Sequence, residues 1–390
     1  MYQQFLATMT SIFTLARWFG VPTYGGRLAL FYSLVLLSML IALEAGSIRK
    51  LVRLLTGVAR NTSGGRGFIA RLSGTVFYGN ALLSLCLSWQ MAYKWRTLSV
   101  YWLYTETRGP YLPPNEHIRR KVIWIASFIG VCAVVEHVLS MMSATGFNIP
   151  PGEYFQRYIL SSHGFLLQNY EYNLWLAIPI FILSKYATIL WNFQDLVVIL
   201  LSVGLASRYR RLNAAVAGAV REERMGKERI KGAIDVSNRL RVWRKIREGY
   251  VQQAALVRRV DTEIGSLILL CNLNNLFFIC LQLFLGIRIS HTSVTDTVYY
   301  FASLGWLLLR AGGVVLSAAD VNLHSKRALT AISRCPCSAY NVEIKRLKQQ
   351  LIHDEVALSG KGFFYLDRQM LLEVAAAIVK YELMLIQYDQ

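Results

Sequence analysis

Charged residues are scarce in this chain of 390 residues, and acidic ones are scarcer than basic ones. Asp, Glu, Lys and Arg make up 17% of the sequence, whereas hydrophobic residues make up 54% and the mean hydropathy is +0.36. Soluble domains carry about 25% charged residues, so this composition excludes an ordinary soluble protein. The chain is predicted to be an integral membrane protein.

Cysteine is also sparse, and its placement gives no sign of a disulfide framework. The six cysteines fall within apolar runs or in a basic connection near the C-terminus. Only Cys335 and Cys337 form a close pair, and a metal site would need two further ligands at a suitable spacing. We interpret this pair as part of a loop turn. No metal and no cofactor is expected.

Clusters of catalytic residues are missing as well. The six histidines are scattered, and no evident nucleophile stands beside a base, so an enzyme is not expected. Gly360-Lys361-Gly362 resembles a fragment of a phosphate loop, but it lacks the preceding strand and the first glycine of that motif. We interpret it as a hinge. No cleavable signal is expected, and the weak apolar stretch 5–21 is predicted to be an interfacial helix.

What the chain does contain is a series of apolar runs. A helix needs about 20 residues to cross a hydrocarbon layer of about 30 Å. Seven runs approach or exceed that length: 28–45, 72–93, 122–143, 174–203, 264–287, 297–319 and 370–388. We therefore predict an all-α membrane protein with seven transmembrane helices.

Basic residues give the chain a net charge of +19, and they lie between the apolar runs. They do not alternate with aromatic platforms, so nucleic acid is not an expected partner. Lys and Arg number six in 94–121, fifteen in 204–263 and eight in 320–369, but only one each in 144–173 and 288–296. The positive-inside rule places the basic connections and the N-terminus in the cytoplasm and the C-terminus outside. This orientation is the reverse of that of a G-protein-coupled receptor.

One connection disagrees with this orientation. Segment 46–71 should lie outside, yet it carries six basic residues. The same segment contains Asn61-Thr62-Ser63, an acceptor for N-glycosylation, which has meaning only on the lumenal side. We retain the inverted topology and predict Asn61 as a glycosylation site.

Two of the basic connections have helical periodicity. The first is predicted to extend the fourth and fifth spans into the cytoplasm as an amphipathic helix, with apolar positions at Val242, Trp243, Ile246, Tyr250, Val251, Ala254, Ala255 and Val257. The second, 341–353, has a stripe at Ile344, Leu347, Leu351 and Ile352. Such helices bury their stripes against each other or a partner, or lie as basic faces near anionic lipid.

A carboxylate within a span marks a functional site. Glu136 lies in the outer half of the third span, where a carboxylate costs about 2.5–3.5 kcal/mol on insertion scales. It therefore needs a polar cavity or a partner. His137 points about 100° away on a helix, and a structural histidine is an equal alternative. Asp195 lies deeper, in the fourth span, and is assigned to packing or to a salt bridge with the basic loops.

Several motifs of this chain resemble those of one known family. The C-terminal block 356–366 and the closing Tyr381-Glu382-Leu383-Met384-Leu385-Ile386-Gln387-Tyr388 are similar to the signature of insect gustatory receptors, and Tyr381-Glu382-Leu383 is most like the sugar-sensing branch of that family. Further similarity lies in 136–140, 191–196 and 275–283, so the resemblance covers most of the chain. Lys380 and Tyr388 depart from the pattern, which has threonine and phenylalanine there.

The resemblance implies a ligand-gated, non-selective cation channel in the plasma membrane. It implies a homo- or hetero-tetramer surrounded by lipid, with a sugar site in the outer half of each subunit and a central pore lined by the last helix. The expected division is a cytoplasmic segment 1–27, a six-helix ligand-binding domain 28–319, and a cytoplasmic anchor helix with the pore helix in 320–390. The alternatives are a G-protein-coupled receptor or an obligate co-receptor subunit.

Sugar recognition needs hydrogen-bonding groups and an aromatic face. Candidates at the outer ends of the spans or along them are Tyr78, Asn80, Glu136, His137, Trp175, Asn274, Asn275, Gln282, Tyr299 and Tyr300. For Trp175, Tyr299 and Tyr300 the alternative is an interfacial aromatic belt. For Asn274 and Asn275 it is hydrogen bonding between helices.

The last helix is the candidate pore and gate. The residues predicted to form them are Tyr381, Leu383, Met384, Ile386, Gln387 and Tyr388, because an apolar ring can close a pore by dewetting. Lys380 would repel cations if it faced the conduction axis. We expect its side chain to bend toward an acidic residue on a neighbouring helix.

Overall fold

The computed structural model describes most of the chain. The described residues are 3–22, 26–57, 65–108, 112, 115–146, 150–225, 233–288, 294–337 and 340–388, with side chains described except at 3, 65–67, 151, 233–236, 287–288 and 381–388. Within these ranges the chain is almost entirely helical, and the one extended pairing is an isolated antiparallel bridge between Ser359 and Tyr365. The predicted all-α architecture is confirmed.

Seven long helices contain the seven predicted spans. They are α2 Arg27–Leu55, α3 Gly65–Arg108, α4 Ile118–Thr145, α6 Leu174–Met225, α7 Ala233–Arg288, α8 Val294–Lys326 and α11 Arg368–Tyr388. Five of these are long and apolar enough to cross a membrane by length and composition: α2, α4, α6, α7 and α8. The remaining two are more polar, and α11 includes Glu373, Lys380 and Glu382.

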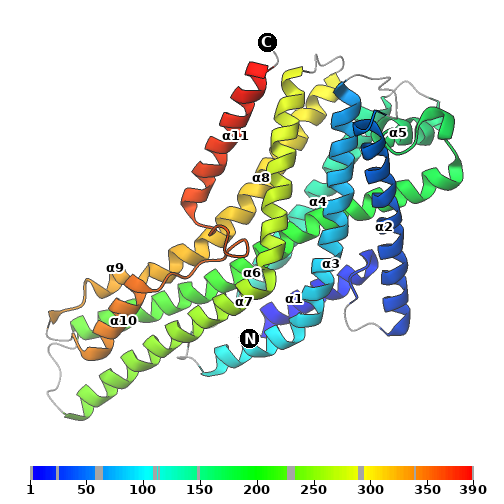
Figure 1. The fold of residues 1–390 in the computed structure, drawn as a ribbon. Coiled ribbons are helices and arrows are strands. Elements are labelled where there is room, and N and C mark those ends of the chain that lie inside the picture. Colours follow the sequence, from blue (N-terminus) through cyan, green and yellow to red (C-terminus); the bar gives the residue numbers. More distant parts are fainter. Residues whose placement is uncertain are drawn as a thin grey trace.

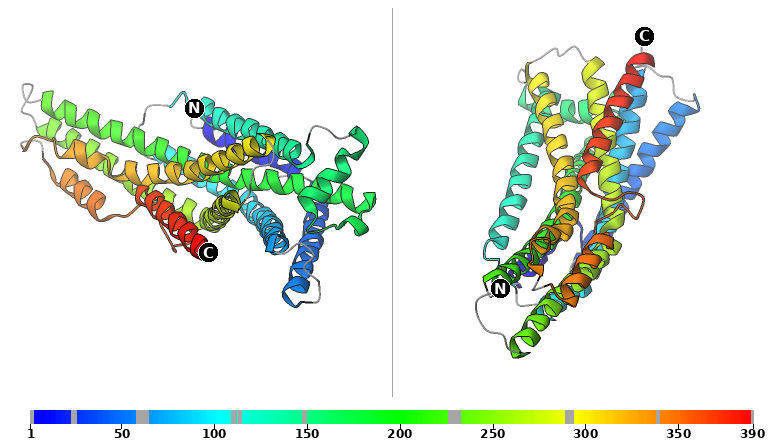
Figure 2. Two further views of the ribbon diagram at one scale, coloured as in Figure 1. Left: turned by 90° about the horizontal axis from the view of Figure 1, so that it is seen from above. Right: turned by 90° about the vertical axis from the view of Figure 1, so that its left-hand side faces the viewer.

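Two of the helices are much longer than a bilayer requires. α6 has 52 residues and α7 has 56, which corresponds to about 78 and 84 Å. They run along most of the elongated molecule (Figures 1 and 2). Trp243, Ile246 and Tyr250 are buried in this extension, as predicted, whereas Val242 and Val251 are exposed.

Two short helices cover the far ends of α6 and α7. They are α9 Ala328–Ile332 and α10 Val342–His353 (Figure 1). Asn341 caps α10, because its side chain accepts hydrogen bonds from the backbone nitrogens of Glu343 and Ile344. The predicted stripe on α10 is buried, except that Ile352 is exposed. This helix therefore packs on the protein rather than presenting its stripe to lipid.

The N-terminal segment is part of the bundle. It forms helix α1 Gln3–Leu15 and a short 3-10 helix, η1 Ala16–Phe19. The rings of Phe13 and Trp95 lie 5.2 Å apart, and Trp95 donates a hydrogen bond to Thr10 Oγ1. The segment predicted as an interfacial helix, 5–21, is thus helical over most of its length, but its apolar side is covered by α3, α4 and α6 rather than by lipid.

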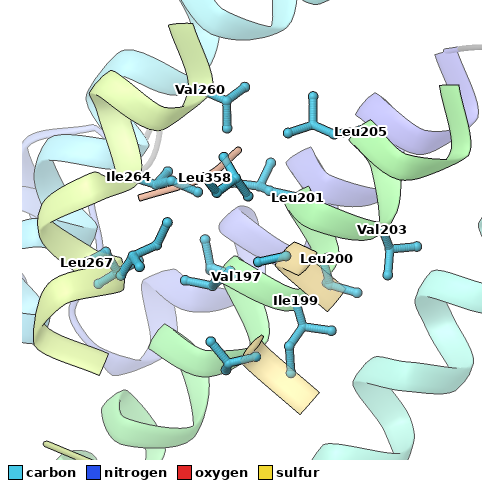
Figure 3. Packing of buried hydrophobic residues seen from close by; sticks show 14 of the residues in the cluster. Val197, Ile199, Leu200, Leu201, Val203, Leu205, Val260, Ile264, Leu267 and Leu358 are labelled. Carbon is cyan, nitrogen blue, oxygen red and sulfur yellow. The ribbon is translucent and has the colours of Figure 1, made fainter. Parts of the chain in front are cut away.

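The core is centred on α6. Its most apolar stretch is 83% buried, compared with 22% in α2 and 11% in α4. Figure 3 shows Val197 and Leu201 of α6 facing Ile264 and Leu267 of α7, with Leu358 closing the same cluster. α6 is therefore surrounded by protein, while α2 and α4 expose apolar side chains to their surroundings.

The basic connection 46–71 is mostly helical. Arg49, Lys50 and Arg53 lie in the last turns of α2, and Lys50 forms an ion pair with Glu171 at 2.5 Å. Glu171 belongs to η3 Asn169–Glu171, which follows η2 Pro151–Glu153 and α5 Tyr154–His163 at the same end of the molecule. One of the six basic residues that disagree with the predicted orientation is thereby paired with an acidic residue. Asn61 lies outside the described residues.

Candidate functional site

Glu136 lies where three helices meet. It projects from α4 and accepts a hydrogen bond of 3.1 Å from Ser303 Oγ of α8, which in turn accepts one of 2.9 Å from Gln282 Nε2 of α7. Tyr299 lies one turn earlier on α8 and interacts electrostatically with Glu136. We call these four residues the Glu136 cluster. It contains three of the predicted binding residues, whereas sequence reasoning missed Ser303.

A second polar group lies beside this cluster. Lys185 of α6 donates a hydrogen bond of 2.7 Å to the hydroxyl of Tyr158 in α5 and lies 4.3 Å from the centre of the Phe181 ring. His163 Nδ1 lies 3.4 Å from the hydroxyl of Tyr78, and both His137 and His163 interact electrostatically with Lys185. We call Lys185, Tyr158, His163, His137 and Tyr78 the Lys185 cluster.

The two clusters form one polar region. Tyr158 is close enough to both Glu136 and Tyr299 to interact with them electrostatically, and burial raises the pKa of Tyr158 to about 12. Burial, together with Lys185 and His137, lowers the pKa of His163 to about 4. The phenol and the imidazole are therefore both neutral at neutral pH. The region combines neutral hydrogen-bonding groups with one carboxylate and one ammonium group, which suits a polyhydroxylated ligand.

Some polar atoms in this region have unused bonding capacity. The Nε2 atoms of His137 and His163 and the Oε1 atom of Gln282 are buried and have no hydrogen-bond partner. Buried polar groups are normally satisfied by protein, water or a ligand. These three atoms are therefore available to accept or donate hydrogen bonds to water or to a ligand.

The other predicted binding residues lie elsewhere. Trp175 is 85% exposed at the start of α6, which fits the alternative of an aromatic belt. Tyr300 packs against Gly286, where an added Cβ would come within 1.9 Å of its hydroxyl oxygen. Asn80, Asn274 and Asn275 are buried between helices. The structure thus brings together five of the predicted binding residues, namely Tyr78, Glu136, His137, Gln282 and Tyr299. The other five lie outside the region: Asn80, Trp175, Asn274, Asn275 and Tyr300.

Asp195 is held within the bundle by an arginine of another span. Of its two expected roles, packing agrees with its complete burial. The salt bridge with the basic loops is wrong, because Asp195 Oδ2 lies 2.6 Å from Arg310 Nε of α8. Asp195 also accepts hydrogen bonds from Cys271 Sγ at 2.6 Å and from Asn275 Nδ2 at 3.3 Å. Both side chains are buried, and their attraction together with these hydrogen bonds offsets part of the cost of removing the charges from water.

Arg310 extends this arrangement to α6. It donates a hydrogen bond of 2.7 Å to Asn192 Oδ1, and its guanidinium lies 4.5 Å above the ring of Trp191. Trp191 Nε1 in turn donates to Asn275 Oδ1 at 2.9 Å. We call these residues, with Cys271 and Asp195, the Asp195 network. Sequence reasoning missed Arg310 and Lys185, although a basic residue inside an apolar span is as clear a signal as Glu136.

The chain enters α11 through a tight turn fixed to α7. Asp261 of α7 accepts hydrogen bonds from Ser359 at both its backbone nitrogen, 2.6 Å, and its Oγ, 2.9 Å. Lys361 and Gly362 adopt left-handed backbone conformations with φ of 56° and 79°. A Cβ on Gly265 would lie 3.2 Å from Lys361 N, so the turn rests directly on α7.

The predicted pore and gate residues lie at the end of α11. The helix continues to Tyr388, but the side chains of Tyr381, Leu383, Met384, Ile386, Gln387 and Tyr388 lie outside the described residues. Its earlier part is partly uncovered, since Leu372 and Val379 are 74% and 57% exposed and Lys380 is exposed. α11 packs on α7 and α8, with its C-terminal end far from α1 (Figures 1 and 2).

No metal cluster occurs in the region that the structure covers. Among the described side chains, no three of His, Cys, Asp or Glu gather in a way that could hold a metal ion.

Comparison with known sequences identifies the family. Residues 31–390 match the sequence model described as trehalose receptor. The chain belongs to the trehalose receptor family of insect gustatory receptors. It is 32% identical over 329 residues to "Gustatory receptor for sugar taste 64a" of Drosophila melanogaster, covering 81% of this chain and 69% of that protein. It is 29% identical to "Gustatory receptor 5a for trehalose" of the same species, with the same coverage.

Comparison with solved structures identifies the fold. The insect olfactory receptor OR5 from Machilis hrabei superposes with a TM-score of 0.70 at 13% sequence identity, over 99% of both chains. The receptor therefore has the fold of an insect chemoreceptor. Its family, and the five membrane-length helices of the described residues, make it a multi-pass protein of the plasma membrane. Its family is one of receptors, not of enzymes.

Proposed function

We propose that the receptor is a subunit of a sugar-gated, non-selective cation channel. The observation that supports this most is the polar region formed by the Glu136 and Lys185 clusters, which draws on α3, α4, α5, α6, α7 and α8. A mono- or disaccharide would accept and donate hydrogen bonds there, with Glu136 and the two histidines as polar partners and Tyr78 and Tyr299 as aromatic ones.

The transmission path leads along α7 to the last helix. Gln282 of α7 belongs to the Glu136 cluster, and Asp261 of the same helix holds Ser359 in the turn before α11. Movement of α7 on sugar binding would therefore displace the start of α11. In a tetramer, whether homomeric or formed with other gustatory receptors, four copies of α11 would line the pore.

The gating equilibrium sets the binding free energy that the ligand must supply. Moving a two-state equilibrium from 1:99 to 99:1 takes about 5.5 kcal/mol of preferential binding to the open state. Shared among four sites, this is about 1.4 kcal/mol for each site, or a tenfold preference. A few hydrogen bonds that form only in the open state supply this amount.

The test is sugar-evoked current through cells or vesicles containing the receptor. Glu136→Gln should raise the half-maximal sugar concentration by about tenfold, because a charge-assisted hydrogen bond is lost. Glu248→Gln is the matched control, since Glu248 is an exposed carboxylate far along α7 that pairs with Arg244. An unchanged dose response for Glu136→Gln at normal surface expression removes it from the sugar site.

Two further measurements separate the alternatives. If no sugar evokes a current from the receptor alone but co-expressed family members restore it, the chain is an obligate co-receptor subunit. An epitope at the C-terminus that is reached only after permeabilisation would contradict the inverted orientation and favour a G-protein-coupled receptor.

For the gate, Gln387→Ala and Tyr388→Ala should change closed-state leak or selectivity. Unchanged leak and unchanged selectivity in both variants exclude this gate.

A further inference from the structure

Several buried polar atoms between α3, α6 and α7 have no hydrogen-bond partner. They are Asn80 Nδ2, Ser88 Oγ, Gln194 Oε1 and both side-chain polar atoms of Asn274. All four residues are at most 4% exposed. Polar groups without partners are especially unfavourable in the interior of a membrane protein, where bulk water does not reach.

Gln194 and Asn274 face the same side of the α6–α7 pair. Gln194 immediately precedes Asp195, and Asn274 immediately precedes Asn275. Asp195 and Asn275 are in contact, because Asn275 Nδ2 donates a hydrogen bond to Asp195. Successive side chains on a helix differ in direction by about 100°. Because α6 and α7 are antiparallel, Gln194 is rotated from Asp195, and Asn274 from Asn275, toward the same side of the helix pair. Gln194 Nε2 donates to Asn80 Oδ1 at 3.4 Å, which identifies that side as the one covered by α3.

α3 presents a polar face at this place. Asn80, Ser84 and Ser88 follow one another at intervals of four residues, so they lie on one side of the helix. Ser84 Oγ donates a hydrogen bond of 3.2 Å to the backbone oxygen of Leu190, which shows that this side abuts α6. Asn80 and Gln194 therefore lie side by side, and Ser88 and Asn274 lie on the faces of α3 and α7 that border the same three-helix interface.

The mixture of donors and acceptors defines the ligand. The amide nitrogens of Asn80 and Asn274 can only donate, whereas the amide oxygens of Gln194 and Asn274 can only accept. A cation would face the amide hydrogens, and an anion would leave the oxygens unsatisfied. Water both donates and accepts, and buried waters typically form about three hydrogen bonds with otherwise unsatisfied groups.

We infer that α3, α6 and α7 enclose a cluster of ordered water molecules, held by Asn80, Ser88, Gln194 and Asn274. This hydrated site is distinct from the proposed sugar site, and it gives Asn80 and Asn274 a role other than the sugar contacts predicted from the sequence. It also adjoins the Asp195 network, because Gln194 and Asn274 are the chain neighbours of two of its members.

The direct test is an experimental structure of the purified full-length receptor at a resolution that reveals water. Density for at least one water is expected within about 3 Å of the Asn274 amide and of Gln194 Oε1. Side-chain density that packs closely here without water, or rotamers that pair these atoms directly with one another, would overturn the inference.

A thermal measurement gives an independent readout. Asn274→Leu keeps the branching and the number of heavy atoms of the side chain but removes its polar atoms, and if waters bridge Asn274 to α3 the melting temperature of this variant falls by about 2 °C or more. If the amide is dry and unpaired, removing it leaves the melting temperature unchanged or higher, which contradicts the hydrated site. Asn272→Leu is the matched control, because Asn272 Nδ2 bonds the Ile268 backbone oxygen within its own helix, and little change is expected.

Discussion

Two groups of charged side chains lie at different depths of the same bundle and differ in how completely their bonding capacity is used. In the Asp195 network, Arg310, Cys271 and Asn275 all contact Asp195, and Arg310 also bonds Asn192. About 15 Å away along α6, the region around Glu136 and Lys185 retains buried nitrogens and oxygens without partners. A closed network fixes helices to one another, whereas an open one retains the capacity to bind.

Breaking the closed network should have the largest effect. Arg310→Met leaves Asp195 as an uncompensated buried charge, and such a change costs about 3–5 kcal/mol of stability. The double variant Asp195→Asn with Arg310→Met should recover much of this loss, because no charge remains unpaired. Melting temperature and surface expression measure both. Equal stability of Arg310→Met and the unmodified receptor would show that the ion pair does not hold the bundle.

Low pH should destabilise the region around Glu136 and Lys185 by protonating His163. Its pKa is about 4 in the folded chain, against 6.5 for the free side chain. Between these values the unfolded chain binds more protons, so stability present above pH 6.5 is lost as the pH falls toward 4. The full loss is roughly 3 kcal/mol.

The pH dependence is measured by thermal melts between pH 7 and pH 4.5. His163→Gln should flatten the fall in melting temperature, and the exposed His353→Gln should not. Parallel curves for His163→Gln and the unmodified receptor would exclude His163 as the titrating group.

Lys185→Met tests whether the open region binds ligand. It keeps the apolar stem but removes the charge and the hydrogen bond to Tyr158. We expect the half-maximal sugar concentration to rise about tenfold, equivalent to about 1.4 kcal/mol, with a smaller effect on stability. A normal dose response at normal surface expression would assign Lys185 to packing.

The smallest effect is expected from Trp191→Phe. It removes the donor to Asn275 but keeps an aromatic face for Arg310. The expected loss is about 1 kcal/mol of stability, with no shift in the sugar dose response. A shift of tenfold would mean that the two regions are not separate in function.

Much of the fold was accessible from the sequence because length and apolarity alone define membrane spans. All seven predicted runs lie inside observed helices. The helix ends were less accessible, since the polar extensions of α6 and α7 are stabilised by packing of residues such as Trp243 and Tyr250 rather than by lipid. The same limit explains why α1 was predicted as an interfacial helix, since its apolar side meets other helices of the bundle instead of the membrane surface.

The candidate site was only partly accessible. Glu136, Gln282 and Tyr299 were predicted from their residue types, and their helices bring them together. Trp175 could not be excluded without knowing which side of α6 faces outward. Ser303 and Tyr158 carry no signal of their own, because a serine or a tyrosine near a membrane interface is common and only its neighbours make it part of a site.

The length of α6 has a mechanical consequence. A single continuous helix of about 78 Å links the end that carries Lys185 with the end that carries α9 and α10. If one end is held, a tilt of about 1° displaces the other by roughly 1 Å. A tilt of α6 about the buried Asp195–Arg310 pair would move Met225, about 45 Å away along the helix, roughly three times as far as Lys185, about 15 Å away.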